Sequence, residues 1–223
     1  MKLKVSTADA ALSQFPESSY ISTSGVYDIT IKFASLDVST GGAESVNFNV
    51  DYKGSPSTLY GPYVQDKAGN VLDIGAKIIN GLAVIAGMSD GEDYVLEKEE
   101  HIVGKDNTPK TFNVITNFTD LPCKVHVQEE WSINPTTKQP RKSLTIKSFF
   151  SEDGATAGEL KSGKDKGKQL GIVLEKYASN ITYRDDLTKE VVDAFKASQK
   201  AGKGSTPAPK PAVAAKAATS LFK

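Results

Sequence analysis

Val-Tyr-Asp-Ile-Thr-Ile-Lys-Phe, residues 26–33, alternates between large apolar side chains and polar ones. Successive side chains leave opposite faces of a strand, so this stretch predicts a half-buried strand with one face toward the core. After the turn residues Gly41-Gly42, the stretch Val-Asn-Phe-Asn-Val-Asp-Tyr at residues 46–52 repeats the pattern. Two such strands joined by a short turn predict an antiparallel pair.

The rest of the chain predicts a third strand broken at Gly61-Pro62, a helix, three more strands and two final helices. In chain order these are residues 58–64, 74–87, 111–115, 123–131, 144–150, 170–177 and 187–195. This order is typical of a five-stranded Greek-key barrel of the OB type, although a generic β-sandwich gives a similar string. We expect a mainly β protein with a few helices: an OB-fold-like barrel, C-terminal helices and a disordered tail.

Composition divides the chain into four parts. We expect an N-terminal arm over residues 1–19, the barrel over 20–160, and a basic loop with packing helices over 161–196. Residues 197–223 are rich in Ala, Lys and Pro and contain no acidic residue. Such a segment cannot bury enough apolar surface to offset the entropy of ordering, which predicts a disordered tail.

Charge is balanced overall but not along the chain. The sequence has 27 basic and 27 acidic residues, yet the first hundred residues carry 7 Lys against 14 Asp and Glu. The remaining residues carry 20 Lys and Arg against 13 acidic residues. A basic half can attract a polyanion, although solvated surface charge gives the same count.

A single cysteine, Cys123, excludes an intrachain disulfide and any site built from several thiolates. Together with the lack of an apolar signal segment after Met1, this favours a reducing, cytosolic compartment and neither secretion nor membrane insertion.

No set of side chains in the sequence predicts catalysis or metal binding. His101 and His126 lack any ligand spacing. Cys123 and His126 have opposite parity on their predicted strand, so without a bulge they cannot pair as nucleophile and base. Residues 158–165 approach the phosphate-loop pattern but place Asp165 where Ser or Thr must hold magnesium. We therefore expect a protein that is not an enzyme and has no cofactor.

Aromatic and basic residues do recur together, the pairing by which proteins bind single-stranded nucleic acid. Cations follow the phosphates, and exposed rings stack on bases. We expect the stacking rings to be Tyr60, Tyr63 and Trp131. The expected phosphate contacts are Lys53, Lys124, Arg141, Lys142 and Lys147.

Several segments resemble bacteriophage replication single-stranded DNA-binding proteins with an OB-type fold. They are residues 24–31, 41–48, 79–82 and 147–150, followed by Gly154 and Glu159, and the similarity covers roughly residues 20–160. The resemblance implies a protein of the host cytoplasm that coats single-stranded DNA during replication and recombination. It also implies that the C-terminal tail contacts a polymerase or another replication partner.

The tail ends in Leu221, Phe222 and Lys223, which we interpret as the partner-binding residues. Many proteins of this functional class end in an acidic tail, whereas this one is basic, so it could also contact DNA. Two other functions stay open: a structural or assembly β-domain of a virion, and a carbohydrate-binding domain.

Overall fold

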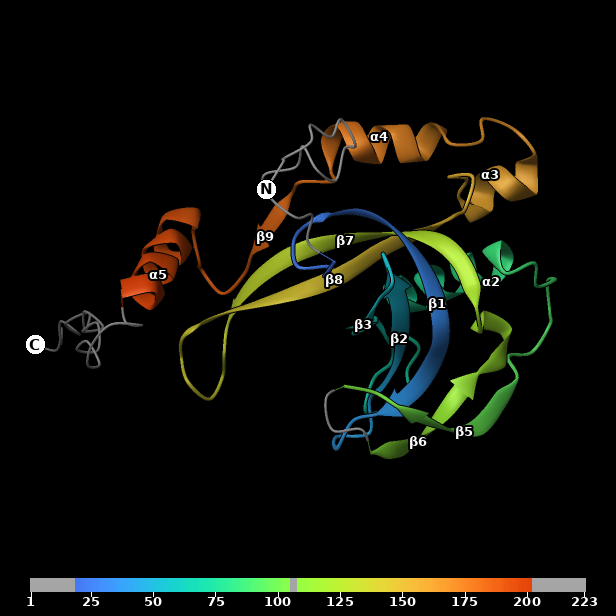
Figure 1. The fold of residues 1–223 in the computed structure, drawn as a ribbon, viewed down its shortest axis with the longest axis horizontal. Helices are drawn as coiled ribbons and strands as arrows, with labels where there is room; N and C mark the ends of the chain where they lie inside the picture. The colour runs from blue at the N-terminus through green and yellow to red at the C-terminus, as the bar shows by residue number, and fades with distance from the viewer. Residues whose placement is uncertain (1–18, 105–107, 202–223) are drawn as a thin grey trace, which may run out of the picture.

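The computed structural model describes residues 19–104 and 108–201, and it confirms a mainly β chain with a few helices (Figure 1). The strands are β1 (Gly25–Val38), β2 (Glu44–Tyr52), β3 (Ser55–Leu59), β4 (Tyr63–Gln65), β5 (Leu96–Ile102), β6 (Pro109–Ile115), β7 (Leu121–Ile133), β8 (Pro140–Ser151) and β9 (Ile181–Tyr183). The helices are α2 (Asp73–Ile85), the short 3-10 turn η1 (Thr116–Phe118), α3 (Ala157–Ser162), α4 (Lys168–Lys176) and α5 (Lys189–Ala201).

Strand β1 organises the sheet because it pairs with three other strands. Its first half, from Gly25 to Ile31, pairs with β7, and its second half pairs with β6 at Ala34 and Ser35. Along its other edge it pairs with β2. The remaining strands extend from these partners: β3 and β4 pair with β2, β5 with β6, and β8 and β9 with β7. All the pairs are antiparallel except β7 with β9.

A β-bulge in β1 changes which side chains face the core. The register with β2 shifts between Ile31 and Phe33. Ile31 before the bulge and Ala34 after it both lie in the core cluster, while Phe33 lies outside that cluster. Phe33 is nevertheless only 4% exposed, because the β5–β6 hairpin covers it: the His101 ring stacks on Phe33 with centroids 3.9 Å apart.

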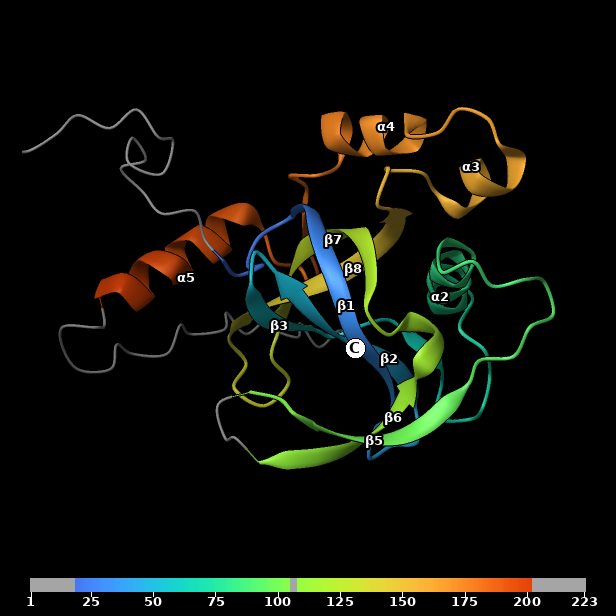
Figure 2. The same cartoon turned by 45° about the vertical axis from the view of Figure 1, so that its right-hand side comes forward.

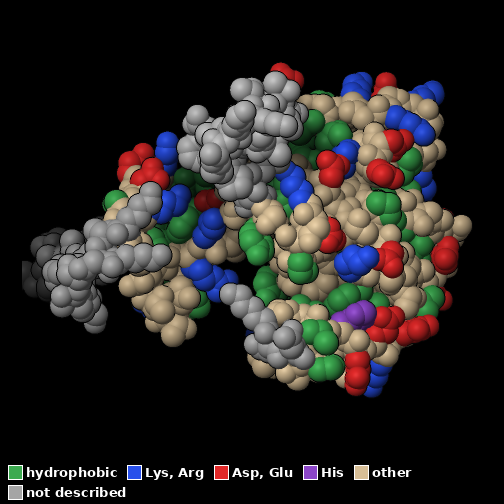
Figure 3. Space-filling model, viewed as in Figure 1, with side chains coloured by type: hydrophobic (Ala, Val, Ile, Leu, Met, Phe, Trp, Pro, Cys, Tyr) green, Lys and Arg blue, Asp and Glu red, His purple; other side chains and the backbone are tan. Residues whose placement is uncertain are grey.

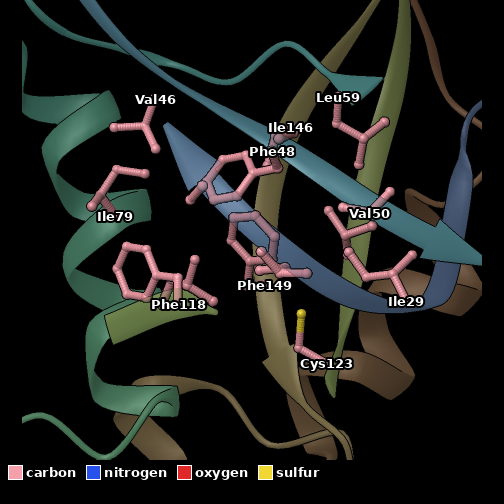
Figure 4. Close-up of a cluster of buried hydrophobic side chains, with 14 of the residues drawn as sticks. Ile29, Val46, Phe48, Val50, Leu59, Ile79, Phe118, Cys123, Ile146 and Phe149 are labelled. Carbon is pink, nitrogen blue, oxygen red and sulfur yellow. The ribbon is translucent and has the colours of Figure 1, made fainter. Parts of the chain in front are cut away.

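The sheet curls around a hydrophobic core. Phe48 on β2 and Phe149 on β8 belong to strands separated by β1 and β7, yet their ring centroids lie 5.1 Å apart (Figure 4). Neighbouring strands are spaced by about 4.8 Å, so a flat sheet would keep these rings much farther apart. Helix α2 closes one side of the core with the buried residues Ile79 and Leu82.

The C-terminal helices lie on the outside of the sheet. Figures 1 and 2 show α3 beside α2, α4 beyond α3, and α5 well away from both, next to the end of the β7–β8 ribbon. Phe150 is buried on the face of β8 opposite Phe149, as the strand alternation requires.

Most of the elements predicted from periodicity are confirmed, including the break between β3 and β4 at Gly61-Pro62. The sequence missed β5, β9 and α3. The predicted tail boundary at residue 197 is wrong, because α5 continues to Ala201. The expected arm (1–19) and the rest of the tail, including Leu221, Phe222 and Lys223, fall outside the described residues, apart from residue 19.

Thr188 lies directly before α5. The Thr188 side chain accepts a hydrogen bond from the Val191 backbone, while Asp185 accepts one from the Ile133 backbone and so holds the end of β7.

Two glycines of α2 should respond oppositely to the same substitution. A Cβ on Gly75 would lie 1.9 Å from the Tyr63 carbonyl oxygen, whereas a Cβ on Gly81 would meet only Ala157 Cβ at an ordinary 4.0 Å. We expect Gly75→Ala to lower the urea midpoint of unfolding and Gly81→Ala to raise it, since Ala is favoured over Gly inside a helix by about 1 kcal/mol. Equal shifts in the two variants would contradict this packing of α2 on β4.

Candidate nucleic-acid interface

Two exposed tyrosine rings lie on the outer side of the β2–β3–β4 part of the sheet. Tyr63 pairs across from Ser45, and the next residue on β2, Val46, faces the core, so Tyr63 lies on the outer face. Tyr60 directly follows Leu59, whose side chain is in the core. The exposed fractions of Tyr60 and Tyr63 are 74% and 55%.

Polar side chains fill the outer face of β2 beside these rings. Asn47 Oδ1 accepts a hydrogen bond from the Gly61 backbone at 3.1 Å, which holds the segment between Tyr60 and Tyr63 against β2. Asn49, which is only 9% exposed, accepts one at its Oδ1 from Thr58 Oγ1 at 3.0 Å. We call the surface made by Asn47, Asn49, Thr58, Tyr60 and Tyr63 the tyrosine face.

The backbone of the tyrosine face is fixed where Gly61 packs closely against the backbone of β2. A Cβ on Gly61 would lie 1.6 Å from the Val46 carbonyl oxygen, so only glycine fits there. The rings are therefore presented by a segment that is fixed to β2. An ordered, exposed ring with a free π-face can stack on a base without reading the sequence.

The expected cations are distributed over several surfaces. Lys53 is exposed at the β2–β3 turn, with its ammonium group 5.4 Å from the centroid of the Tyr52 ring. Lys124 forms an ion pair with Asp28 on the neighbouring strand. Lys142 donates to the Ser22 carbonyl at 2.7 Å and lies 3.8 Å from the Glu129 carboxylate. Lys124 and Lys142 thus have partners within the protein.

The two remaining cations lie on β8 and do not reach the tyrosine face. Arg141 is exposed and pairs opposite Ser132 near the β7–β8 turn. Because Lys142 is its neighbour on the strand, Arg141 and Lys142 point to opposite faces. Lys147 lies at the bulge of β8, near His126. The predicted set therefore does not form one surface: β2 and β1 separate β3 and β4 from β7 and β8.

The expected exposure of Trp131 is wrong. Its ring is 5% exposed, its Nε1 donates to Glu129 Oε1 at 2.6 Å, and the Lys196 ammonium lies 4.7 Å from its centroid. Sequence reasoning missed this because β9 was not predicted, and because the predicted last helix, α5, lies far along the chain and no local pattern shows that it covers the end of β7. Glu129 is itself 5% exposed and lies between Lys142 and Lys196.

The structure confirms that Cys123 and His126 cannot act together. Cys123 lies in the core, where burial raises the pKa of its thiol to about 12, and a thiol of this kind is not a nucleophile near neutral pH. His126 is buried outside the core cluster, and burial together with the nearby Lys147 lowers its pKa. In the described ranges no three His, Cys, Asp or Glu side chains come together as a metal site.

The sequence did not single out the amides of the tyrosine face. Asn47 and Asn49 alternate with core residues on β2, which could have marked them as a polar row on the outer face. The aromatic cluster of Phe33, His101 and Phe112 was not foreseen either, since β5 lacks strand periodicity and the bulge in β1 reverses the expected orientation of Phe33.

No protein-family model matches the chain, and a search of curated proteins finds no match. Among the described residues, no helix has both the length and the apolar character needed to span a bilayer.

The burial of Trp131 can be tested by fluorescence, because it is the single tryptophan of the chain. We expect native emission at shorter wavelength than that of the urea-unfolded chain and weak quenching by iodide. Lys196→Ala removes the side chain over the ring and should raise quenching by the neutral quencher acrylamide. Native quenching as strong as that of the unfolded chain would contradict the enclosed position of the ring.

Proposed function

We propose that this protein binds single-stranded DNA without sequence preference and acts without catalysis in bacteriophage DNA replication and recombination. The observation that carries the proposal is the tyrosine face, where Tyr60 and Tyr63 present two exposed rings beside the half-buried Asn47 amide. In this proposal the C-terminal residues Leu221, Phe222 and Lys223 contact a polymerase or another replication protein.

The topology supports an OB-type barrel as the fold of this protein. A meander of strands precedes a helix, further strands follow it, and the first strand is shared between partners on both sides. OB barrels bind oligonucleotides on the face of their second and third strands. The tyrosine face lies on β2, β3 and the adjoining β4, which is the corresponding region of this sheet.

Charge near the tyrosine face is mixed. Asp37 accepts a hydrogen bond from the Asn47 amide and Asp51 accepts one from the Gly54 backbone at 3.0 Å, and both carboxylates keep their negative charge. The exposed Lys53 stands at the β2–β3 turn. Stacking on the two tyrosines therefore supplies most of the affinity in this proposal, and nearby lysines supply its salt dependence.

Removing the rings tests the proposal. Tyr60→Ala and Tyr63→Ala should each weaken binding of a fluorescent single-stranded oligonucleotide, measured by anisotropy. A loss of about 1–3 kcal/mol per stacked base corresponds to roughly 5- to 150-fold in Kd. Tyr60→Phe and Tyr63→Phe should retain binding because they retain the ring.

Tyr177→Ala is the matched control, since Tyr177 is 49% exposed but follows α4, away from the tyrosine face. The wild type should also prefer the single strand to the matching duplex. Absence of single-strand binding at low salt would refute the proposed function. Equal losses in all three alanine variants would refute the assignment of the tyrosine face.

A further inference from the structure

The segment between α3 and α4 concentrates exposed lysines on a small, ordered corner of the molecule. Residues 156–176 contain five lysines against three acidic residues. Lys161, Lys164, Lys166 and Lys168 are all exposed, and they lie within eight residues of one another along the chain. Figure 3 shows blue groups, interspersed with red ones, over the region where Figure 1 draws α3 and its connection to α4. We call these four lysines the basic corner.

A buried carboxylate fixes the backbone of the basic corner. Glu159 is 7% exposed and accepts hydrogen bonds from the Thr156 backbone at 2.8 Å and the Gln169 backbone at 2.9 Å. It thereby ties the start of α3 to the start of α4. Gly163 ends α3 in the left-handed conformation with φ 66°. The basic loop that the sequence predicts here is thus a folded turn that carries the lysines.

Two of the four lysines of the basic corner, Lys161 and Lys164, are available to a ligand. Among the described residues, Lys168 pairs with Asp165 at 3.8 Å. The hydrogen bond from Ser151 and, to a smaller extent, the charge of Lys166 lower the pKa of the Asp153 carboxyl. No carboxylate in the described part of the chain pairs with Lys161 or Lys164. Buried Glu159 offers no exposed negative charge.

Helix α2 connects the basic corner to the tyrosine face. At Gly75 it touches the backbone of Tyr63, and at Gly81 it faces Ala157 on α3. These two points are six residues apart, about 9 Å along a helix. Between them α2 carries Lys77, which is exposed. Helix α2 therefore lies between the segment that carries Tyr63 and the helix that carries Lys161.

We propose that the basic corner is a second contact site for the phosphates of the DNA strand whose bases stack on Tyr60 and Tyr63. The strand crosses α2 near Lys77 and reaches Lys161 and Lys164. This inference rests on the proposed function, because it extends the path of the same ligand. It predicts that the corner acts only on strands long enough to reach it.

The test compares two oligonucleotides, one of about 5 nucleotides, near the lower limit for an OB-fold site, and one of about 20. Each is titrated at several salt concentrations against the wild type and the double variant Lys161→Gln/Lys164→Gln. For the long strand the slope of log K against log salt should become shallower by about 1.4, since each phosphate contact contributes about 0.7. Between about 50 and 200 mM salt this is a sevenfold difference.

The short strand should bind both proteins alike. Lys176→Gln/Lys189→Gln is the matched control, because both lysines are exposed but outside the basic corner, and it should leave both slopes unchanged. An unchanged long-strand slope in the corner variant, with normal wild-type binding, would overturn this inference and leave the proposed function intact. An equal change for the short strand would also overturn it, and failure of the wild type to bind either strand would instead refute the function itself.

Discussion

The bulge in β1 is the constraint on which the structure depends. One strand pairs with β7 along its first half and with β6 along its second, while β2 follows its other edge. Without the register shift between Ile31 and Phe33, either Ile31 or Ala34 would leave the core, because alternation would place them on opposite faces. The bulge lets both face inward and turns Phe33 outward, where the β5–β6 hairpin covers it.

The curvature of the sheet follows from this arrangement. Bulges increase the local twist and bend of a strand, and here the bend allows Phe48 on β2 to meet Phe149 on β8 across the core. The inner face of β2 makes this contact, and its outer face carries the amides of Asn47 and Asn49. The candidate interface is thus the outer, polar face of β2, whose inner face contributes to the core.

The outer surface of the protein has separate acidic and basic regions. Acidic side chains gather over the β5–β6 hairpin, where Glu97, Glu99 and Glu100 follow one another along β5 (Figure 3). Lysines gather at the basic corner, whose helix α3 packs against α2. On the proposed path, the DNA strand runs toward these lysines and away from the carboxylates of β5.

The sequence predicts the parts of this fold that depend on local periodicity. The alternation in β1, β2 and β7 and the helical stripe of α2 each follow from side chains a few residues apart. Strand β5 could not be predicted, because its residues Leu96–Ile102 are mostly charged and exposed and gain their strand conformation by pairing with β6. The register shift in β1 likewise depends on its partners.

In the candidate site, too, some features follow from the local sequence and others depend on distant contacts. Tyr60 and Tyr63 could be predicted to be exposed, because each flanks the Gly61-Pro62 break. Trp131 could not be placed correctly, since its burial depends on contacts with α5, more than fifty residues further along the chain. The pairing of Lys124 with Asp28 is equally non-local, and it removes a cation that the sequence presents as free.

The most direct test of the account is a backbone-amide NMR titration of the isotopically labelled protein with a short single-stranded oligonucleotide. The account predicts that the largest shift changes fall on Asn47, Asn49, Tyr60, Gly61 and Tyr63, with little change at Trp131 or Lys142. Changes confined to β7 and β8, or no changes at concentrations that saturate binding of other single-strand binders, would contradict the central claim that the outer face of β2 binds the bases.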